Sequence, residues 1–476
     1  MLPEKPLLIR NAEVNGIAAV DVYIRDGHIA AIQADMAVPE GAEIRDAAGG
    51  ALLPGLKDHH MHLAALAVSR QSLQCGPPRI ADADALAKAL KQQAKTHPDQ
   101  WIRGIGYHES VAGDLDAAWL DAHVHNTPLR IQHRGGRLWV LNNAALEALQ
   151  VTDEDPLERR DGRLTGRLYE GDLWLRERLA SVGQAAFPNL AAVSRELASY
   201  GITGITDTSP QNDVQALHAF AAAQRRGELL QSIRVMGNAS LDGVTFNEAD
   251  VEVGEHKFHL LESALPDIEQ LVAAIKTSHR HGRSVAFHCV TRVELMFALA
   301  ALHEAGSQPG DRIEHAAITT PECLVDMKAL GVTVVTQAGL IAERGDHYLA
   351  EVDHEDQPWL YRLQAFIDAD VPLAGSSDAP YTATNPWLGM RAAVLRQTRT
   401  GQVIGEAESL SPEQALNLYT SALQKPGVTG SKLEVGTRAD LCLLTQPWSK
   451  LCVDFGLAKV ALTLRGGRPI WSVNLA

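Results

Sequence analysis

The sequence predicts an α/β protein: a (β/α)8 TIM-type barrel with a small β-sandwich domain formed by the N- and C-terminal segments. Two observations predict this fold. In the middle of the chain, eight short apolar, β-branched runs alternate with helical patterns, which is typical of a closed parallel barrel. At both ends, strand-like runs follow one another instead. The 476 residues are enough for one elaborated barrel and a smaller domain.

The two termini are expected to pair in one small sheet. Residues 7–53 contain strand-like runs, two of them separated by an Asp-Gly turn signal in "AAVDVYIRDGHIAAI". The C-terminus shows the same style in "ADLCLLT" and "KVALTLRGGRPIWSVN". The expected boundaries are 1–53 and 431–476 for the two parts of the β-sandwich domain, and 54–430 for the barrel.

The barrel strands are expected where the eight runs lie. These are residues 51–59, 201–208, 232–238, 256–261, 284–290, 312–318, 332–338 and 371–378. In the first, "LLPGLKDHHMHL" (52–63), we expect the apolar run and the histidines to form one strand through Pro54-Gly55. A doubly wound open sheet is the alternative, but no Gly-x-Gly-x-x-Gly follows the first strand.

The first strand is followed by a very long connection, at about 64–200. Connections of this length usually form lids or pocket walls, so we expect this insertion at the mouth of the barrel.

The composition excludes several partners. Acidic residues exceed basic ones by 15, so neither nucleic acid nor an anionic membrane is expected as a partner. The five scattered cysteines form no Cys-x-x-Cys pair, which argues against disulfides and a thiolate zinc site. We see no signal peptide and no apolar stretch of about 20 residues. We expect a cytoplasmic enzyme with a small-molecule substrate. The sequence leaves open whether it forms a homo-oligomer.

Polar residues stand at the ends of several expected strands, where barrel active sites lie. Alternate residues of a strand share a face, so His60 and His62 are predicted to converge on one ion, with His59 facing away and Asp58 orienting the ligands. The further candidates, on strands four, five, six and eight, are Lys257, His288, His315 and Asp378. Alone, each has an ordinary structural explanation, and Glu314 is interpreted as a structural pair partner. Together they predict a metal site.

This pattern resembles the amidohydrolase superfamily, and most closely its YtcJ-like branch, amidohydrolase family 3. The resemblance covers nearly the whole chain. The pieces that carry it are "WIRGIGYHE", "NNAAL", "DGRLTGRLYEG", "RIEHAAI", "GSSDAPYTATNPWLGMRAAV" and "SPEQALNLYTSALQ".

The resemblance implies how metal would be held. A strand-four lysine carrying CO₂ often bridges two ions in the family, and Lys257 stands at that position. His288 and His315 would then hold the second ion. Glu170 in "GRLYEGD" is an alternative bridge. Imidazole and carboxylate ligands favour one or two divalent ions, Zn²⁺ above all.

The sequence departs from the branch in two loops. Arg137 stands where a histidine is usual, and Thr291 and Arg292 replace a Gly-Asp pair. We hypothesise that Arg137 and Arg292 bind an anionic group of the substrate; the open alternative is that each pairs with a neighbouring acid.

The predicted function is hydrolysis of an amide-type C–N bond of a small molecule. A divalent ion would make hydroxide available at neutral pH, and Asp378 would act as general acid and base. Deaminases of the superfamily typically carry a glutamate where Thr291 stands, so deamination is disfavoured. Deamination, isomerisation or another metal-dependent hydrolysis at the same site, and a non-catalytic relative, are the alternatives. No Gly-x-Ser-x-Gly supports a serine hydrolase.

Overall fold

The computed structural model describes residues 5–98, 100–183, 187–428, 430 and 432–473. The chain forms two compact units. Unit 1 is Met1–Leu63 together with Asn189–Ala476, and unit 2 is Ala64–Pro188.

Unit 1 contains the predicted barrel. Its eight strands are all parallel and follow one another in chain order around the sheet. They are β6 (Leu56–Met61), β14 (Ile202–Asp207), β15 (Ser232–Gly237), β16 (Val251–His259), β17 (Val285–Cys289), β18 (Arg312–His315), β19 (Thr333–Thr336) and β20 (Leu373–Gly375). Six of the expected runs contain one of these strands, and the runs 51–59 and 256–261 overlap β6 and β16 in part, so the fold class is confirmed.

The first expected strand was wrong in one respect. The run 51–59 does not form one barrel strand: β5 (Ala51–Pro54) pairs with the terminal sheet, and only β6 belongs to the barrel. The chain changes sheets at Gly55, where a Cβ atom would lie only 2.4 Å from Thr203 Oγ1. Only glycine fits this close approach, so the Pro-Gly pair marks the change of sheet.

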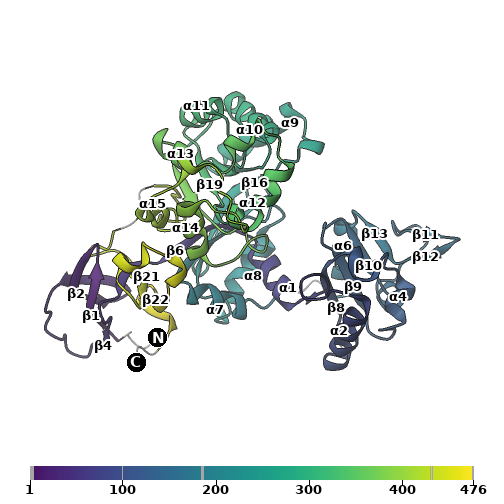
Figure 1. Cartoon of the computed structure of the whole chain (residues 1–476), viewed down its shortest axis with the longest axis horizontal. Helices are drawn as coiled ribbons and strands as arrows, with labels where there is room; N and C mark the ends of the chain where they lie inside the picture. Colours follow the sequence, from purple (N-terminus) through teal and green to yellow (C-terminus); the bar gives the residue numbers. More distant parts are fainter. Residues whose placement is uncertain (1–4, 99, 184–186, 429, 431, 474–476) are drawn as a thin grey trace. The chain divides into compact units, whose positions relative to one another are not determined.

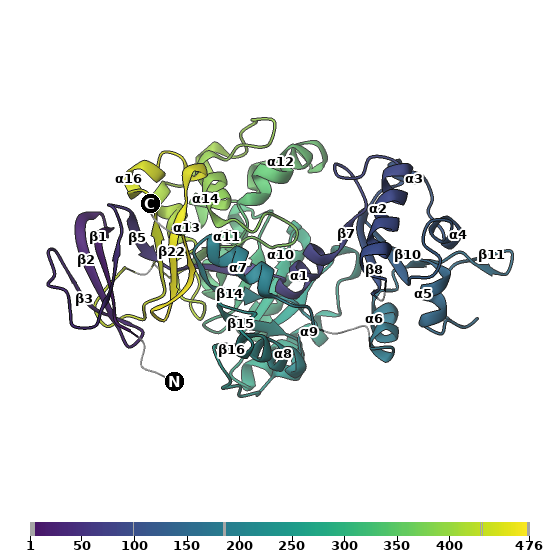
Figure 2. The same ribbon diagram turned by 90° about the horizontal axis from the view of Figure 1, so that it is seen from below.

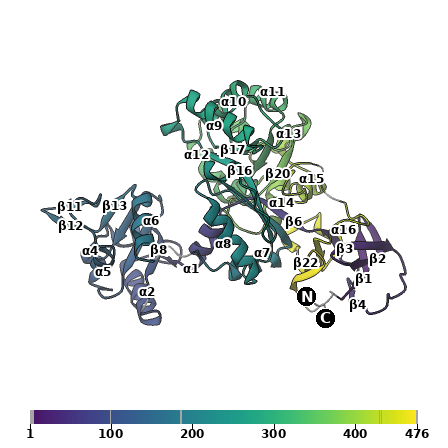
Figure 3. The ribbon, with the colours of Figure 1, turned by 180° about the vertical axis from the view of Figure 1, so that it is seen from behind.

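Helices surround the barrel strands, as the teal and green helices in Figures 2 and 3 show. They are α7 (Ala191–Ser199), α8 (Val214–Arg225), α9 (Ile268–Arg280), α10 (Arg292–Ala305), α11 (Pro321–Leu330), α12 (Gly339–Glu351), α13 (Gln364–Asp368), α14 (Pro386–Leu395) and α15 (Pro412–Asn417). Their apolar faces pack on the strands; α9, for example, buries Leu271, Val272 and Ile275. Among the helices of the described residues, none has the length and apolarity that a membrane crossing requires.

The two termini pair in one sheet, as expected. Its strand order is β23-β22-β21-β5-β1-β2-β3, with β4 beside β1. The bounds are β1 (Leu7–Val14), β2 (Ile17–Arg25), β3 (His28–Gln33), β4 (Glu43–Asp46), β21 (Leu441–Leu444), β22 (Val460–Arg465) and β23 (Arg468–Ser472). Figure 1 shows the purple N-terminal strands beside the yellow C-terminal ones. Apolar side chains from both groups, such as Ile9 and Leu443, share one core.

Unit 2 has its own small fold. Five strands pair in the order β13-β10-β9-β8-β7, and a separate hairpin pairs β11 with β12. The strands are β7 (Leu73–Gln74), β8 (Ile102–Tyr107), β9 (Leu129–His133), β10 (Leu138–Leu141), β11 (Arg159–Arg160), β12 (Arg163–Leu164) and β13 (Arg167–Tyr169). The helices are α2 (Ala83–Thr96), α3 (Glu109–Ala112), α4 (Ala117–Asp121), α5 (Asn143–Ala148) and α6 (Asp172–Ser181). The insertion was expected to extend to about 200, and α7 in its last part lies in unit 1.

Candidate metal centre

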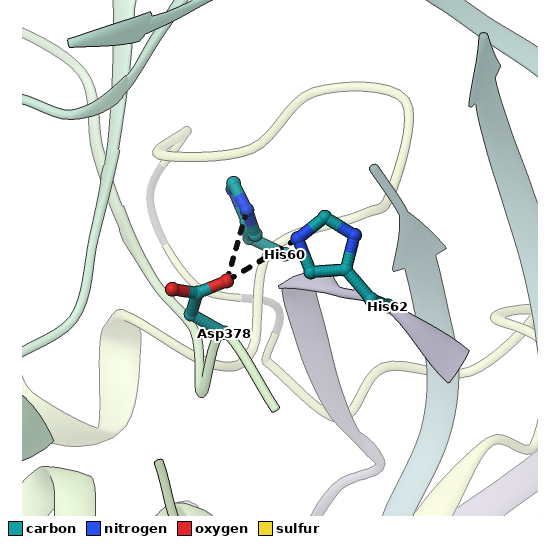
Figure 4. Close-up of side chains that lie close together, drawn as sticks. All are labelled: His60, His62 and Asp378. Atoms are coloured by element: carbon teal, nitrogen blue, oxygen red, sulfur yellow. Dashed lines mark ion pairs between the residues drawn. The ribbon is translucent and has the colours of Figure 1, made fainter. Parts of the chain in front are cut away.

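Barrel strands one and eight bring three polar side chains together. Asp378 N donates a hydrogen bond to His60 O at 2.8 Å, and His62 N donates to Ala379 O at 2.8 Å. These bonds hold the loop after β20 against the end of β6. Asp378 Oδ1 consequently lies 3.4 Å from His60 Nε2 and 3.5 Å from His62 Nε2 (Figure 4). Ligand atoms of all three residues lie within 4.8 Å of one another, close enough to share one ion.

Three histidines are oriented through their Nδ1 atoms, each by a different neighbour. Glu314 Oε2 and Gln337 Oε1 are acceptors, so the histidines facing them donate from Nδ1 and keep Nε2 free of a proton when neutral. This is the usual arrangement of a histidine that binds metal. The pairs are His60 with Glu314 at 2.5 Å, His62 with Ser209 Oγ at 3.2 Å and His315 with Gln337 at 2.7 Å.

The other predicted histidines continue this group. The ring centroid of His315 lies 4.7 Å from that of His60 and 4.5 Å from that of His288. His259, two residues beyond Lys257 on β16, lies 4.5 Å from His288. Burial lowers the pKa of both His288 and His315, so both imidazoles are neutral at pH 7, as ligands must be.

Two buried polar atoms in this group have no hydrogen-bond partner among the described residues: Lys257 Nζ and Asp378 Oδ1. Burial lowers the pKa of Lys257 to about 8, although the Glu314 carboxylate opposes this. Burial alone would raise the pKa of Asp378, but His60 and His62 hold it well below its usual range. Unsatisfied buried groups cost free energy, so a pair of them at one place indicates a site for a ligand.

A buried acid supports the histidines from inside the barrel. Arg312 Nε donates to Glu314 Oε1 at 2.8 Å, and both side chains are fully buried. Burial would raise the pKa of Glu314, but the charges of Arg312 and Lys257 hold it well below its usual range. Glu314 is therefore ionised. The prediction that it is a structural pair partner understates its role, because it also fixes the orientation of His60.

These residues fit a divalent cation. His60, His62 and Asp378 would hold one ion, and His288 and His315 supply imidazoles for a second. Burial and Lys257 lower the pKa of His60, yet the neighbouring carboxylates of Asp378 and Glu314 raise it overall. A cation would take the place of that extra proton. A neutral Lys257 amine can react with CO₂ to form a carbamate, which requires the unprotonated form that a pKa near 8 makes accessible.

The two remaining polar residues of the first strand have structural contacts. His59 is fully buried, its Nε2 lies 3.1 Å from Ser421 Oγ, and burial lowers its pKa to about 3. Asp58 accepts hydrogen bonds from His60 N at 3.2 Å and from Ser377 N at 3.1 Å. It thus ties the two strand ends that carry the candidate ligands.

The backbone is strained at two candidate ligands. His315 has φ 69° and Asp378 has φ 58°, in the left-handed region that side chains with a Cβ rarely adopt. Each such residue costs on the order of 1–3 kcal/mol, and such strain is concentrated at active sites.

Comparison with known proteins agrees with this geometry. The model of the amidohydrolase family matches residues 43–470, which is most of the chain. The chain belongs to the amidohydrolase family. It is a metal-dependent hydrolase that acts on carbon–nitrogen bonds other than peptide bonds.

Two curated proteins and one solved structure are similar to this chain over most of its length. An N-substituted formamide deformylase of Arthrobacter pascens is 24% identical over 93% of this chain and 94% of its own. The putative amidohydrolase YtcJ of Bacillus subtilis (strain 168) is 23% identical over 94% and 95%. The structure of an uncharacterized metal-dependent hydrolase from Pyrococcus horikoshii OT3 superposes with a TM-score of 0.78, covering 95% of this chain and 99% of the other at 22% identity. The last similarity shows a shared fold.

The remaining predicted site residues are each paired with an acid or a base. In unit 2, Arg137 Nη1 lies 3.7 Å from Glu170 Oε1, and both exposed side chains line an open cavity of about 640 Å³. In unit 1, Arg292 Nη1 lies 3.0 Å from Asp356 Oδ1. Both arginines thus pair with a neighbouring acid, which is the alternative that the sequence left open. Their substrate-binding roles, and that of Glu170 as a metal bridge, stay predictions.

The sequence did not lead us to two residues that orient histidines of the candidate metal centre, Ser209 beside His62 and Gln337 beside His315. Gln337 follows directly on β19, and Ser209 stands two residues after β14, so both are polar residues at strand ends. That position was a usable signal. His259 was also missed, although it shares the face of Lys257 on β16.

Proposed function

We propose that the protein hydrolyses an amide-type C–N bond of a small molecule, with Asp378 as the group that accepts and returns the proton. One observation supports this above all. The unpartnered Asp378 Oδ1 stands 3.4–3.5 Å from two imidazole Nε2 atoms. A carboxylate kept ionised and unpartnered at this place can bind a cation through one oxygen and exchange a proton through the other.

The reaction needs two proton movements. Asp378 accepts a proton from the attacking water molecule as the oxygen of that water bonds to the carbonyl carbon. The same carboxyl group then gives the proton to the nitrogen as the C–N bond breaks, leaving a carboxylic acid and an amine. The low pKa of Asp378 means that its carboxylate is ionised and ready for the first transfer at neutral pH.

A divalent ion bound by the histidines and Asp378 supplies Lewis acidity and lowers the pKa of water to about 7. Zn²⁺ is the ion we propose, because neutral imidazole and carboxylate are ligands that it accepts readily. Lys257, as a carbamate, would add the anionic bridge that a second ion requires.

A simple amide is the substrate class to test first. The relative from Arthrobacter pascens is named as a deformylase of N-substituted formamides. We therefore propose N-formyl and N-acetyl derivatives of primary amines as the first panel. Isomerisation at the same site would be recognised by a product of unchanged mass.

The test compares wild-type protein with Asp378→Asn. We expect purified wild type to contain a divalent metal, measured by plasma mass spectrometry, and to hydrolyse members of the panel. Asp378→Asn should retain most of the metal, because the histidines remain. It should lose about a thousandfold or more in kcat, because the proposed proton acceptor is removed.

Two outcomes would contradict the proposal. Protein that holds no divalent metal, and gains no hydrolysis on addition of Zn²⁺, has no metal-dependent activity. Full turnover by Asp378→Asn would show that another group moves the proton.

A further inference from the structure

Helix α12, which follows barrel strand β19, is hydrogen-bonded to the loop that carries Asp378. Glu343 Oε1, on α12, accepts a hydrogen bond from Ala383 N at 2.8 Å. The neighbouring Arg344 donates from Nη2 to Tyr381 O at 3.1 Å. Since Tyr381 N donates to Asp378 O at 2.9 Å, the Arg344 guanidinium is linked to the candidate metal centre through one short turn.

The charge of Arg344 is not neutralised by a partner. Over the described residues, no carboxylate oxygen lies within 4.0 Å of this guanidinium, and its one protein hydrogen bond is to Tyr381 O. The adjacent acid, Glu343, is bound to the loop backbone instead. Arg292, the arginine of unit 1 that the sequence singled out, differs in this respect, since its Nη1 lies 3.0 Å from Asp356 Oδ1. Four of the five N–H donors of Arg344 therefore remain for water or a ligand.

Two phenols lie beside this guanidinium. Arg344 and Tyr348 are four residues apart on α12 and so share a face. Burial and the nearby Asp378 raise the pKa of Tyr381, and Arg344 opposes this, so the phenol lies within electrostatic reach of both charges. The Tyr381 ring stands edge-on to His62, with centroids 5.8 Å apart, yet its side chain is 57% exposed. Tyr381 thus contacts a candidate metal ligand through its exposed ring and an unpaired cation through its backbone carbonyl.

We propose that Arg344 binds a carboxylate on the substrate, which lies along Tyr381 with its amide group at the metal centre. The inference rests on the proposed function and narrows it to amides of amines that carry an anionic group. Arginine suits this role, because its planar fork binds a carboxylate through two parallel hydrogen bonds. The flat ring beside it provides an apolar wall for the chain between the carboxylate and the amide.

The test uses matched pairs of N-formyl amines. Each pair has the same carbon chain, of three to six carbons, with or without a terminal carboxylate, for example N-formyl-4-aminobutyrate and N-formylbutylamine. Binding is measured by calorimetry on Zn²⁺-loaded Asp378→Asn, and kcat/KM on Zn²⁺-loaded wild type. At the best chain length we expect the carboxylate to be preferred by about ten- to a hundredfold, the range for a charged hydrogen-bonded pair.

Variants at Arg344 decide whether this residue is responsible. Arg344→Met should reduce the preference ratio to about one. Arg344→Lys should keep part of the preference for the carboxylate, because the positive charge remains but the planar guanidinium, which can form two parallel hydrogen bonds, is lost. Arg399→Met, which removes an exposed arginine after α14, is the matched control and should keep the full ratio.

The outcomes separate this inference from the proposed function. No preference for the carboxylate at any chain length, or no binding of either member, overturns the inference, and so does a preference that survives in Arg344→Met. If carboxylates bind through Arg344 and no formamide is hydrolysed, the inference stands and the proposed reaction fails.

Discussion

Two buried lysines of the barrel differ in one respect. Lys57, on β6, donates to Thr203 Oγ1 at 2.5 Å and lies 3.4 Å from Asp440 Oδ2. Lys257, on β16, has no hydrogen-bond partner among the described residues. Burial lowers the pKa of both. The contacts of Lys57 join the barrel to the terminal sheet, so its charge is used for structure.

The difference teaches how to distinguish a structural group from one kept for a ligand. A buried polar atom without a partner costs on the order of 1–3 kcal/mol, and a stable fold retains few of them. Lys257 stands among the candidate metal ligands, where a carbamate or a metal would satisfy it. The residue type is the same and neither side chain is far exposed, so the partners are what separate the two roles.

Among the variants that test this comparison, Lys257→Ala is expected to have the largest effect. If Lys257 forms the bridge, the variant should bind less metal than wild type by about one equivalent, and lose about a thousandfold in kcat/KM, because the second ion supplies several kcal/mol. Metal content is measured by plasma mass spectrometry and kcat/KM on the best panel amide.

Lys57→Met is the matched control for this variant. It removes a buried lysine from the same barrel and should leave the metal content unchanged. Equal metal loads in Lys257→Ala and wild type would rule out the carbamate bridge.

A smaller effect is expected for Glu314→Gln, which keeps the shape and removes the charge that orients His60. Loss of such support typically lowers metal affinity by about 10- to 100-fold. Zn²⁺ affinity is measured by competition with a chelator. Glu255→Gln is the control. Glu255 also lies near Arg312, at 3.9 Å, but of these two glutamates it is Glu314 that contacts His60 Nδ1. Equal losses in both variants would contradict an orienting role.

The smallest effect concerns a satisfied carboxylate. Glu408 accepts from Arg362 Nε at 2.8 Å and from Leu363 N and Ala365 N at 2.9 Å each. Burial would raise the pKa of Glu408, but these donors lower it overall. A folded-state pKa below the unfolded value of about 4.3 stabilises the protein above that pH, and the stabilisation is lost as the pH falls through the folded value.

Glu408→Gln should therefore be less stable than wild type at pH 7 by about 1–3 kcal/mol, and the difference should shrink as the pH is lowered below about 4. Urea unfolding at a series of pH values measures this. Glu406→Gln, at an exposed position two residues away, should show no such difference. If the free energies of unfolding of Glu408→Gln and wild type differ by the same amount at all pH values, the charge of Glu408 does not contribute to stability.

Much of the fold could be predicted because periodicity is a local property. Each barrel strand overlaps an expected run, since parallel strands buried on both faces read as apolar, β-branched segments. The first run failed, because β5 and β6 are separated by Gly55 alone along the chain and yet belong to different sheets. The close approach of Gly55 to Thr203 separates them, and that contact joins residues 148 positions apart.

The sequence by itself determined the barrel, the paired termini and the candidate ligands, because hydrophobic patterning and the ends of parallel strands follow from local order. Only the tertiary structure decided which polar groups are satisfied. The pairing of His60 with Glu314 and of His315 with Gln337, the isolation of Lys257 and the unpaired charge of Arg344 depend on contacts between distant strands and helices. Hydrogen bonds and ion pairs act over a few ångströms, and spacing along the chain does not fix such distances.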